Sequence, residues 1–293
     1  MARLFSVVVV LTALFWLLER RYRPTWPPDD PQDPSAARRL GLRRDTRTDL
    51  LYWLFTPLVT KTITSGALVV AVFVLASAKG VHVDRASGIG PLLAGSPILG
   101  QPRWLQGIEA LVLLDFTGYW IHRLFHRGRL WRFHAVHHSS RRLTWLSAAR
   151  LHPINDLLTR LVQVIGLLLL GFDPMVLAGV VPFTNFYALL LHARLPWDYG
   201  RLRYVIASPA FHRWHHTSEA EGCDKNFAGF LPIWDLLFGT FFMPRDRPPI
   251  RFGVTGERVP EGLLAQLWWP FRAPAPVTAT GSEAPPQGRA APG

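Results

Sequence analysis

Several features that would indicate a common soluble enzyme are missing from this sequence. Its 293 residues contain one cysteine, Cys223, so an intrachain disulfide is impossible and a thiolate zinc site is excluded. No serine or cysteine lies in a recognisable nucleophile elbow, so a catalytic triad has no support. Glutamate is scarce and stands apart from the histidine-rich segments described below, at Glu19, Glu109, Glu219, Glu221, Glu257, Glu261 and Glu283.

The charge balance is one-sided, because acidic residues are outnumbered and the net charge is +12. Such a charge can indicate a nucleic-acid partner. Here the arginines lie between long apolar runs, and hydrophobic residues make up 49% of the chain. This layout follows the positive-inside rule of membrane proteins. We therefore predict an integral membrane protein that does not bind nucleic acid.

The apolar runs predict about four transmembrane helices behind a short N-terminal anchor at Leu4–Leu18. Leu50–Ala78 is long enough to cross a hydrocarbon core of ~30 Å, and Trp104–Ile121 returns. Leu157–Leu170 and Met175–Leu191 follow, separated by G-F-D-P. The fourteen residues of the first of these are few for a full span, so the pair forms either two spans or a hairpin that dips into the bilayer.

Charge also predicts the orientation. The stretch from Arg123 to Arg150 carries seven arginines and no acidic residue, so we place it in the cytoplasm. An even number of later crossings returns the chain to that side. We predict three parts: residues 1–49 as anchor and basic cytoplasmic linker, 50–245 as the membrane domain, and 246–293 as an interfacial aromatic segment (Leu263–Phe271) followed by a disordered tail.

Eight of the eleven histidines lie in three short boxes. His122 and His126 are four residues apart, which places them on one face of a helix. The other two boxes have the form H-x-x-H-H, whose spacing also converges on one face; they are His134, His137, His138 and His212, His215, His216.

This spacing predicts a polynuclear metal site. Imidazole suits iron, copper, zinc or nickel. Since no glutamate lies beside the ligands, a zinc hydrolase of the H-E-x-x-H type and a carboxylate-bridged site in a soluble bundle are disfavoured. An all-imidazole site at a membrane edge favours iron and dioxygen. A dizinc lipid hydrolase and a non-catalytic metal-binding or bis-histidine haem protein remain the alternatives.

From about Trp104 to Phe242 the sequence resembles the fatty acid hydroxylase/sterol desaturase superfamily of membrane-bound non-haem di-iron enzymes, in a bacterial-type form. D-F-T-G-Y-W-I-H-R-L-F-H resembles its first box, F-H-A-V-H-H-S-S its second and F-H-R-W-H-H its third. The downstream D-K-N-F-A-G-F-L-P-I-W-D-L-L-F-G-T is similar too. The resemblance implies an all-α membrane protein whose helices lie under a cytoplasmic helical cap holding two irons.

The resemblance also implies further site residues. His192 matches a histidine that follows the last membrane helix, although Ala188 stands where some relatives carry a second one. His152 matches a histidine of bacterial-type members and is a possible ligand. Asp115, Tyr119, Asp224 and Asn226 are possible ligands or partners that orient imidazole N–H groups. Beyond the metal ligands we expect no distinct catalytic residue.

The predicted function is therefore an O2-dependent lipid hydroxylase or desaturase in the bacterial inner membrane, with the histidine boxes on the cytoplasmic side. No cytochrome b5-like haem motif occurs in the sequence, so the electrons are expected from a ferredoxin or cytochrome b5-like donor with its reductase. The sequence identifies neither the lipid nor the choice between hydroxylation and desaturation.

Overall fold

The computed structural model describes residues 2–22, 35–84 and 86–272, and these ranges contain helices and no strand. The only bridge among them is an isolated pair, Thr217 with Phe252. The all-α prediction is confirmed. The helices are α1 (Ala2–Tyr22), α2 (Ser35–Phe55), α3 (Lys61–Ala78), α4 (Gly90–Leu93), α5 (Arg103–Phe125), α6 (Trp131–His138), α7 (Pro153–Leu170), α8 (Pro174–His192), α9 (Pro209–His215), α10 (Ile233–Leu237) and α11 (Leu263–Trp268).

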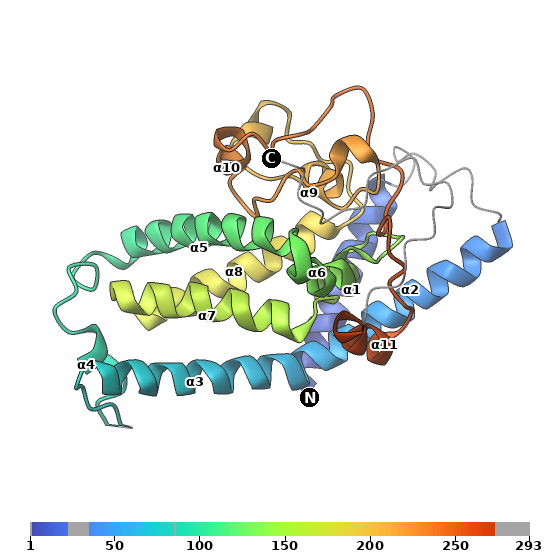
Figure 1. The fold of residues 1–293 in the computed structure, drawn as a ribbon. Coiled ribbons are helices and arrows are strands. Elements are labelled where there is room, and N and C mark those ends of the chain that lie inside the picture. The colour runs from blue at the N-terminus through green and yellow to red at the C-terminus, as the bar shows by residue number, and fades with distance from the viewer. Residues whose placement is uncertain (1, 23–34, 85, 273–293) are drawn as a thin grey trace.

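Four long helices, α3, α5, α7 and α8, form a bundle (Figure 1). Helix α5 packs against α7 and α8, and α7 packs against α3. The short helix α4 lies at one end of the bundle, and α6, α9, α10 and α11 gather towards the other. Every histidine box therefore lies at the end opposite α4.

Three of the helices begin with the same local signal, a polar cap followed by proline. The side chains of His152, Asp173 and Ser208 accept hydrogen bonds from backbone N–H groups in the first turns of α7, α8 and α9. Proline is well suited to the next position because its missing N–H would be unsatisfied there in any case. These caps fix where α8 starts and where the third box becomes helical.

Among the described residues, three helical stretches are long and apolar enough to cross a membrane: Arg44–Ala78, Pro153–Leu170 and Pro174–His192. Much of their apolar surface is exposed, as at Val70 (62%) and Val162 (54%), which suits contact with lipid. The run at Leu157 becomes a helix of 18 residues because Pro153–Asp156 extend it. Helix α5 is not among the three, and Gln106, Glu109 and Asp115 lie along it.

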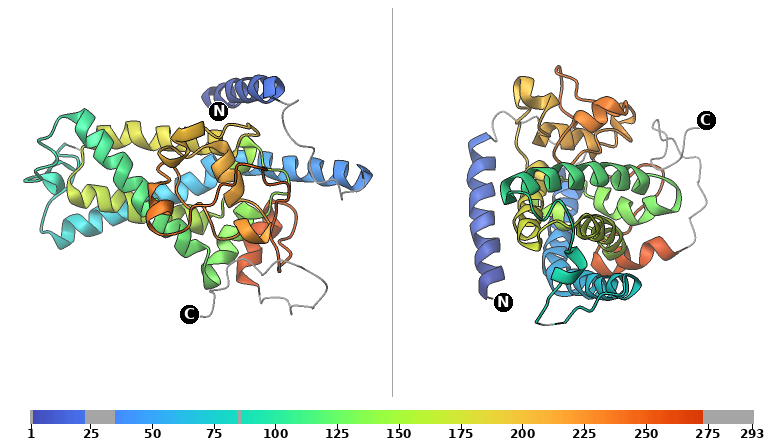
Figure 2. Two further views of the ribbon diagram at one scale, coloured as in Figure 1. Left: turned by 90° about the horizontal axis from the view of Figure 1, so that it is seen from above. Right: turned by 90° about the vertical axis from the view of Figure 1, so that its left-hand side faces the viewer.

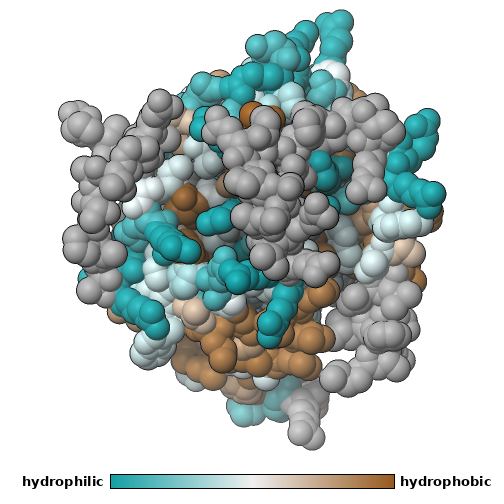
Figure 3. Space-filling view, turned by 90° about the vertical axis from the view of Figure 1, so that its right-hand side faces the viewer, coloured by the Kyte–Doolittle hydropathy of each residue, from teal (hydrophilic) through white to brown (hydrophobic). Residues whose placement is uncertain are grey.

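Helix α1, the predicted anchor, crosses the bundle near its histidine end and does not run alongside the long helices (Figures 1 and 2). Phe15 of α1 stacks on Trp145 with ring centroids 5.2 Å apart. The face of the molecule at this end exposes many hydrophilic residues, with a hydrophobic patch low on it (Figure 3). Whether α1 inserts into a membrane stays a prediction.

The predicted parts of the chain fall partly outside the described residues. The proline-rich stretch of the linker, within residues 23–34, and the tail predicted as disordered, 273–293, both lie outside them. The predicted interfacial segment is described: Leu264 and Trp268 of α11 are 79% and 63% exposed, whereas Trp269 is buried. Its contact with a membrane stays a prediction, as do the boundaries of the three parts.

Candidate metal centre

The three boxes come from three helices that meet at one end of the bundle. His122 lies in the last turn of α5, and His126 follows directly as the C-cap of this helix. Helix α6 carries the second box, while α9 carries His212 and His215 and has His216 as its C-cap. His192 is the last residue of α8. The helical spacing predicted for the boxes is confirmed.

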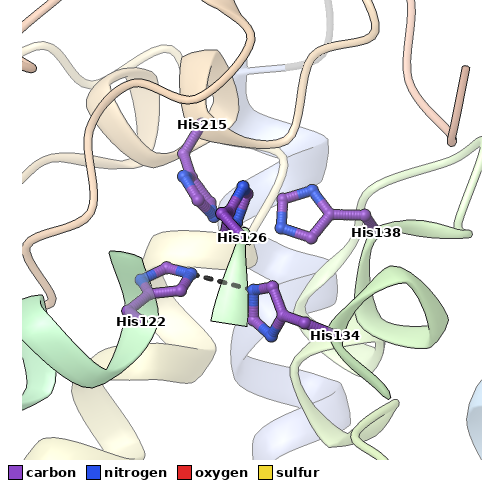
Figure 4. A group of neighbouring side chains, drawn as sticks. All are labelled: His122, His126, His134, His138 and His215. Atoms are coloured by element: carbon purple, nitrogen blue, oxygen red, sulfur yellow. Dashed lines mark hydrogen bonds between the residues drawn. The ribbon is translucent and has the colours of Figure 1, made fainter. Parts of the chain in front are cut away.

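The nine predicted histidine ligands fall into two groups that could each hold a metal ion. The nitrogen atoms offered by each group lie within 4.8 Å of one another. Figure 4 shows the first group, with rings converging from α5, α6 and α9. The five-histidine group is His122, His126, His134, His138 and His215, and the four-histidine group is His137, His192, His212 and His216.

The second and third boxes exchange one histidine between these groups. In α6 the first and last histidines join the five-histidine group, and His137 joins the other. In α9 the first and last join the four-histidine group, and His215 crosses over. The groups are adjacent, since the rings of His138 and His216 stack with centroids 4.3 Å apart. Each of the two short helices thus contributes to both groups.

Oxygen atoms around the centre fix the orientation of six rings. The Nδ1 atoms of His122, His137, His192 and His215 lie 2.7–3.0 Å from backbone carbonyls, which can only accept. His134 meets Asn155 Oδ1 at 2.8 Å, and His126 meets the Asp224 carboxylate at 2.9 Å. Each Nδ1 therefore carries the proton, and each Nε2 turns a lone pair into the centre.

The resulting arrangement fits bound cations. His137 and His192 bring their Nε2 atoms within 3.1 Å, and His122 and His134 within 2.9 Å. A neutral pair so oriented has no proton to share, so its two lone pairs repel unless a cation lies beside both. Two ligands at right angles around a metal ~2.1 Å away are themselves ~3.0 Å apart. The spacing therefore suits a pair of transition-metal ions.

Buried nitrogens without partners point the same way. Within the described part of the chain, Nε2 of His126, Nε2 of His215 and both ring nitrogens of His138 are buried and make no hydrogen bond. Such atoms are rare in proteins because losing water without a replacement partner is costly. Coordination of a metal would satisfy them.

Electrostatics keep the rings of α6 and α9 neutral. Burial lowers the pKa of His134, His137 and His138 well below the ordinary value, and neighbouring imidazoles lower it further. The pKa values of the three α9-box histidines shift in the same direction for the same reasons. A histidine coordinates a metal ion as the neutral imidazole. These rings are already neutral near neutral pH, so they can bind a metal ion without first losing a proton.

The segment from Asp224 to Thr240, which contains α10 and is called the supporting loop below, supports the five-histidine group. It supplies the carbonyls of Lys225 and Phe227 that orient His215 and His122. Asp224 itself contacts His126, and both Asp224 and Asn226 have positive φ values, 55° and 58°. The Asn226 side chain bonds to backbone groups of Phe211 and Phe242, which ties the loop to α9.

Asp115 and Tyr119 act on the same loop and touch no histidine nitrogen in the described contacts. Asp115 accepts hydrogen bonds from the N–H groups of Gly229 and Leu231 and from the Trp234 indole. Tyr119 bonds to Thr240 at 2.9 Å. Both residues therefore fix the loop to α5, the helix that carries His122.

His152 lies apart from both groups. Its Nδ1 accepts from the N–H of Ile154 as the cap of α7, and its Nε2 donates to the carbonyl of Leu267 at 3.0 Å. Both ring nitrogens are used in these bonds. The geometry assigns His152 a structural place between α7 and α11.

The roles of two residues in the centre, Asn155 and Asp235, were not predicted from the sequence, although Asp235 lies in the downstream motif that resembles the family. Asn155 orients His134 but belongs to no histidine box, and the one available signal was a polar residue at the start of an apolar run. Asp235 accepts from the N–H groups of Phe227 and Ala228 and from Thr240, and so holds the supporting loop. Ala188, where a second histidine was considered, contributes its carbonyl to His192.

A largely apolar cavity of about 650 Å³ reaches the histidines. His122 and His134 of one group and His137 and His192 of the other lie in its wall. Side chains such as Trp53, Ile121, Phe186 and Leu189 line much of the rest. An apolar ligand in this cavity would therefore lie directly against both groups.

The geometry argues against two alternatives. A porphyrin cannot fit between imidazole nitrogens that approach to 2.9–3.2 Å. Neither metal group includes a carboxylate among the described residues, and the buried Glu219 is bound to Arg247 and to backbone N–H groups. The described centre therefore lacks the glutamate that a zinc hydrolase of the H-E-x-x-H type uses as its general base.

Fold and site together define an all-helical protein with two histidine groups at the end of a bundle of apolar helices. Residues 108–240 match the family model described as fatty acid hydroxylase. Over these residues the sequence thus matches the family that its boxes predicted.

Curated relatives agree with the family. The chain is 38% identical over 171 residues to ornithine lipid hydroxylase OlsE of Rhizobium tropici, covering 58% of this chain and 51% of that protein. It is 35% identical over 147 residues to alkylglycerol monooxygenase of Danio rerio, covering 50% and 32%. Very-long-chain aldehyde decarbonylase GL1-1 of Oryza sativa subsp. indica is 31% identical over 157 residues, covering 47% and 25%.

The chain thus spans about half the length of the first of these relatives and less of the others. No solved structure matches it significantly.

Proposed function

We propose that this protein is a membrane-bound di-iron oxygenase that uses O2 and external electrons to hydroxylate or desaturate a C–H bond of a lipid. One observation carries the proposal: neutral imidazoles of two adjacent metal-sized groups line an apolar cavity of about 650 Å³. The family match and the printed names of the relatives, a lipid hydroxylase and a monooxygenase among them, support it.

The nine histidines would hold two irons, one in each group, and bound iron would supply the activation of dioxygen that an unreactive C–H bond requires. The protein orients the imidazole rings and keeps water away from the metal centre. Carbonyl, amide and carboxylate oxygens hold six rings by their Nδ1 atoms. Eight of the nine histidines are at most 7% exposed, which restricts access of water to the centre.

We further propose that α3, α5, α7 and α8 span the membrane and that the histidines lie on its cytoplasmic side. Three of these helices belong to sufficiently apolar stretches, and α5 lies among them in the bundle. The arginine-rich stretch 123–150 supports the orientation. The membrane would be a bacterial inner membrane, and a ferredoxin or cytochrome b5-like protein with its reductase would deliver the electrons.

The experiment combines metal analysis with product analysis. Protein purified from membranes should contain two irons per chain and consume O2 when reduced in the presence of lipid. A strain lacking the gene should lose lipid species that differ by +16 or −2 mass units from their precursors. His137→Ala should abolish both O2 consumption and lipid modification. His82→Ala should leave both unchanged, because the His82 side chain is 89% exposed, follows the end of α3 and belongs to neither histidine group. Zinc in place of iron, with no O2 uptake, would overturn the proposal.

A further inference from the structure

One region of the cavity wall is charged although the rest is largely apolar. We call Lys61, Asp156, Arg160 and Asn185 the polar corner; all four line the cavity. Lys61 Nζ lies 2.6 Å from Asp156 Oδ1, and Arg160 Nε lies 3.7 Å from the same oxygen. Arg160 also donates to Asn185 Oδ1 at 2.6 Å. The corner joins α3, α7 and α8 across the cavity.

The polar corner has more positive charge than its own carboxylate can neutralise. Two cations share one aspartate, which leaves a formal charge of +1. An ammonium has three N–H donors, and within the described part of the chain Asp156 is the hydrogen-bond partner of Lys61. Both oxygens of Asp156 are engaged, because Thr64 donates to the second one. The corner therefore has an excess positive charge that one anion would neutralise, and N–H donors on Lys61 that could bind it.

The surroundings make an unbound cation unfavourable here. The Lys61 side chain is 40% exposed, yet Pro57, Phe186 and Leu189, which line the same cavity, are apolar, and Phe186 is itself 43% exposed. A charge that opens on a lipid-facing surface is costly unless a polar partner meets it. An anionic lipid head would be that partner.

We propose that the polar corner binds the anionic group of the substrate, a carboxylate or a phosphodiester, and that the lipid is oxidised at a carbon close to this head. The proposal rests on the oxygenase function proposed above and names its substrate class. Asn155, which orients His134, precedes Asp156 directly and lies five residues before Arg160, a rise of about 7.5 Å along α7. If Lys61 and Arg160 bind the head group, only a few bonds of the lipid would separate the head group from the carbon atom that lies next to the histidines.

The binding of an anionic head group by the polar corner is tested by measuring lipid binding to the full-length protein in micelles of a neutral detergent. The probes are oleic acid (carboxylate), dioleoyl phosphatidylglycerol (phosphodiester) and uncharged monooleoylglycerol. Lys61→Gln and Arg160→Gln should each weaken binding of one or both anionic probes about tenfold and leave monooleoylglycerol unaffected. Lys79→Gln is the matched control, because Lys79 is exposed at the far end of α3.

The variant Asp156→Asn distinguishes two roles of the polar corner: binding the anionic head of a lipid, or only holding the helices together through an ion pair. If the corner binds an anion, removing its carboxylate raises the charge and strengthens binding of the anionic probes. If the corner only holds the helices together, Asp156→Asn and Lys61→Gln weaken binding and lower the melting temperature alike, which would overturn the proposal. Equal affinity of all variants for all probes would overturn it as well.

Product analysis tests the proposed position of oxidation. Fragmentation mass spectrometry should place the added oxygen within a few bonds of the head, and oxidation in the middle or at the end of the chain would refute that position. The two proposals can fail separately. Selective anion binding by a protein that holds no iron and takes up no O2 would support the anion site and refute the oxygenase function. O2-dependent turnover with no preference for charged lipids would support the oxygenase function and refute the anion site.

Discussion

His137 and His192 face each other with their Nε2 atoms 3.1 Å apart, although each ring already donates its Nδ1 proton to a backbone carbonyl. These rings come from α6 and α8, which are brought together only in the folded protein. Without a cation the two lone pairs repel. The bound metal is therefore expected to stabilise the fold as well as to carry out chemistry.

Removal of the metal should lower the thermal stability. A ligand that binds only the folded state adds about 1.4 kcal/mol for each tenfold excess over its dissociation constant. Treatment with reductant and a ferrous chelator should therefore lower the melting temperature, and added Fe²⁺ should restore it. Zn²⁺ should restore the melting temperature without restoring O2 uptake. An unchanged melting temperature in the metal-free protein would contradict this view of the centre.

Asn155→Ala should weaken metal binding, because it removes the acceptor that orients His134. Loss of such a partner typically costs about 10- to 100-fold in metal affinity. Competition against a chromophoric chelator measures the effect. Asn155→Asp keeps an acceptor oxygen and should retain most of the affinity. If Asn155→Ala bound iron as tightly as the parent, the contact would have no role in the centre.

His152→Ala should keep both metals and reduce stability. His152 caps α7 and bonds to the Leu267 carbonyl, and loss of a helix cap costs about 1 kcal/mol. The melting temperature should fall slightly while the iron content stays at that of the parent. A loss of one iron per chain would instead make His152 a ligand, as its resemblance to bacterial-type members allowed.

Glu219 should make the segment after the third box sensitive to acid. Burial alone would raise the pKa of Glu219, but hydrogen bonds from Arg247 and from the N–H groups of Ile250 and Arg251 outweigh burial and lower it. Its contribution to stability is present above the unfolded pKa of about 4.5. That contribution is lost as the pH falls through the lower folded pKa.

Glu219→Gln should consequently flatten the dependence of the melting temperature on pH below about pH 5. The matched control is Glu257→Gln, whose carboxylate is 31% exposed and pairs with Arg132 at 3.5 Å. If both variants followed the pH profile of the parent, the bonds of Glu219 would not be the source of the acid response.

Much of the centre could be predicted because histidine spacing is a local property. Positions i, i+3 and i+4 share a helical face, so the box histidines were expected on helices that converge. The split of His137 and His138 between two groups was not predictable from spacing. Neighbouring residues of a helix point in different directions, and which group each ring joins depends on the helices opposite.

The partners that orient the rings were harder to predict. Four of the six are backbone carbonyls, which every residue possesses and no sequence motif marks. Asn155 lies 21 residues from the ring it orients. The helices of the bundle were predicted where apolar runs are long. Helix α5 was harder to predict as a span, because Glu109 and Asp115 lie within it. The reason for a carboxylate at Asp115 becomes clear only from its hydrogen bonds to the supporting loop, which is distant in sequence.

The exchange of His137 and His215 between the two groups has a thermodynamic consequence. Because α6 and α9 each contribute to both groups, an ion in one group draws both helices into the positions that the other group requires. The ordering of these helices then occurs largely with the first ion, so the second binds with higher affinity. The two metal ions should therefore bind cooperatively. At a substoichiometric metal concentration, most molecules should hold either no ion or two ions, and few should hold one.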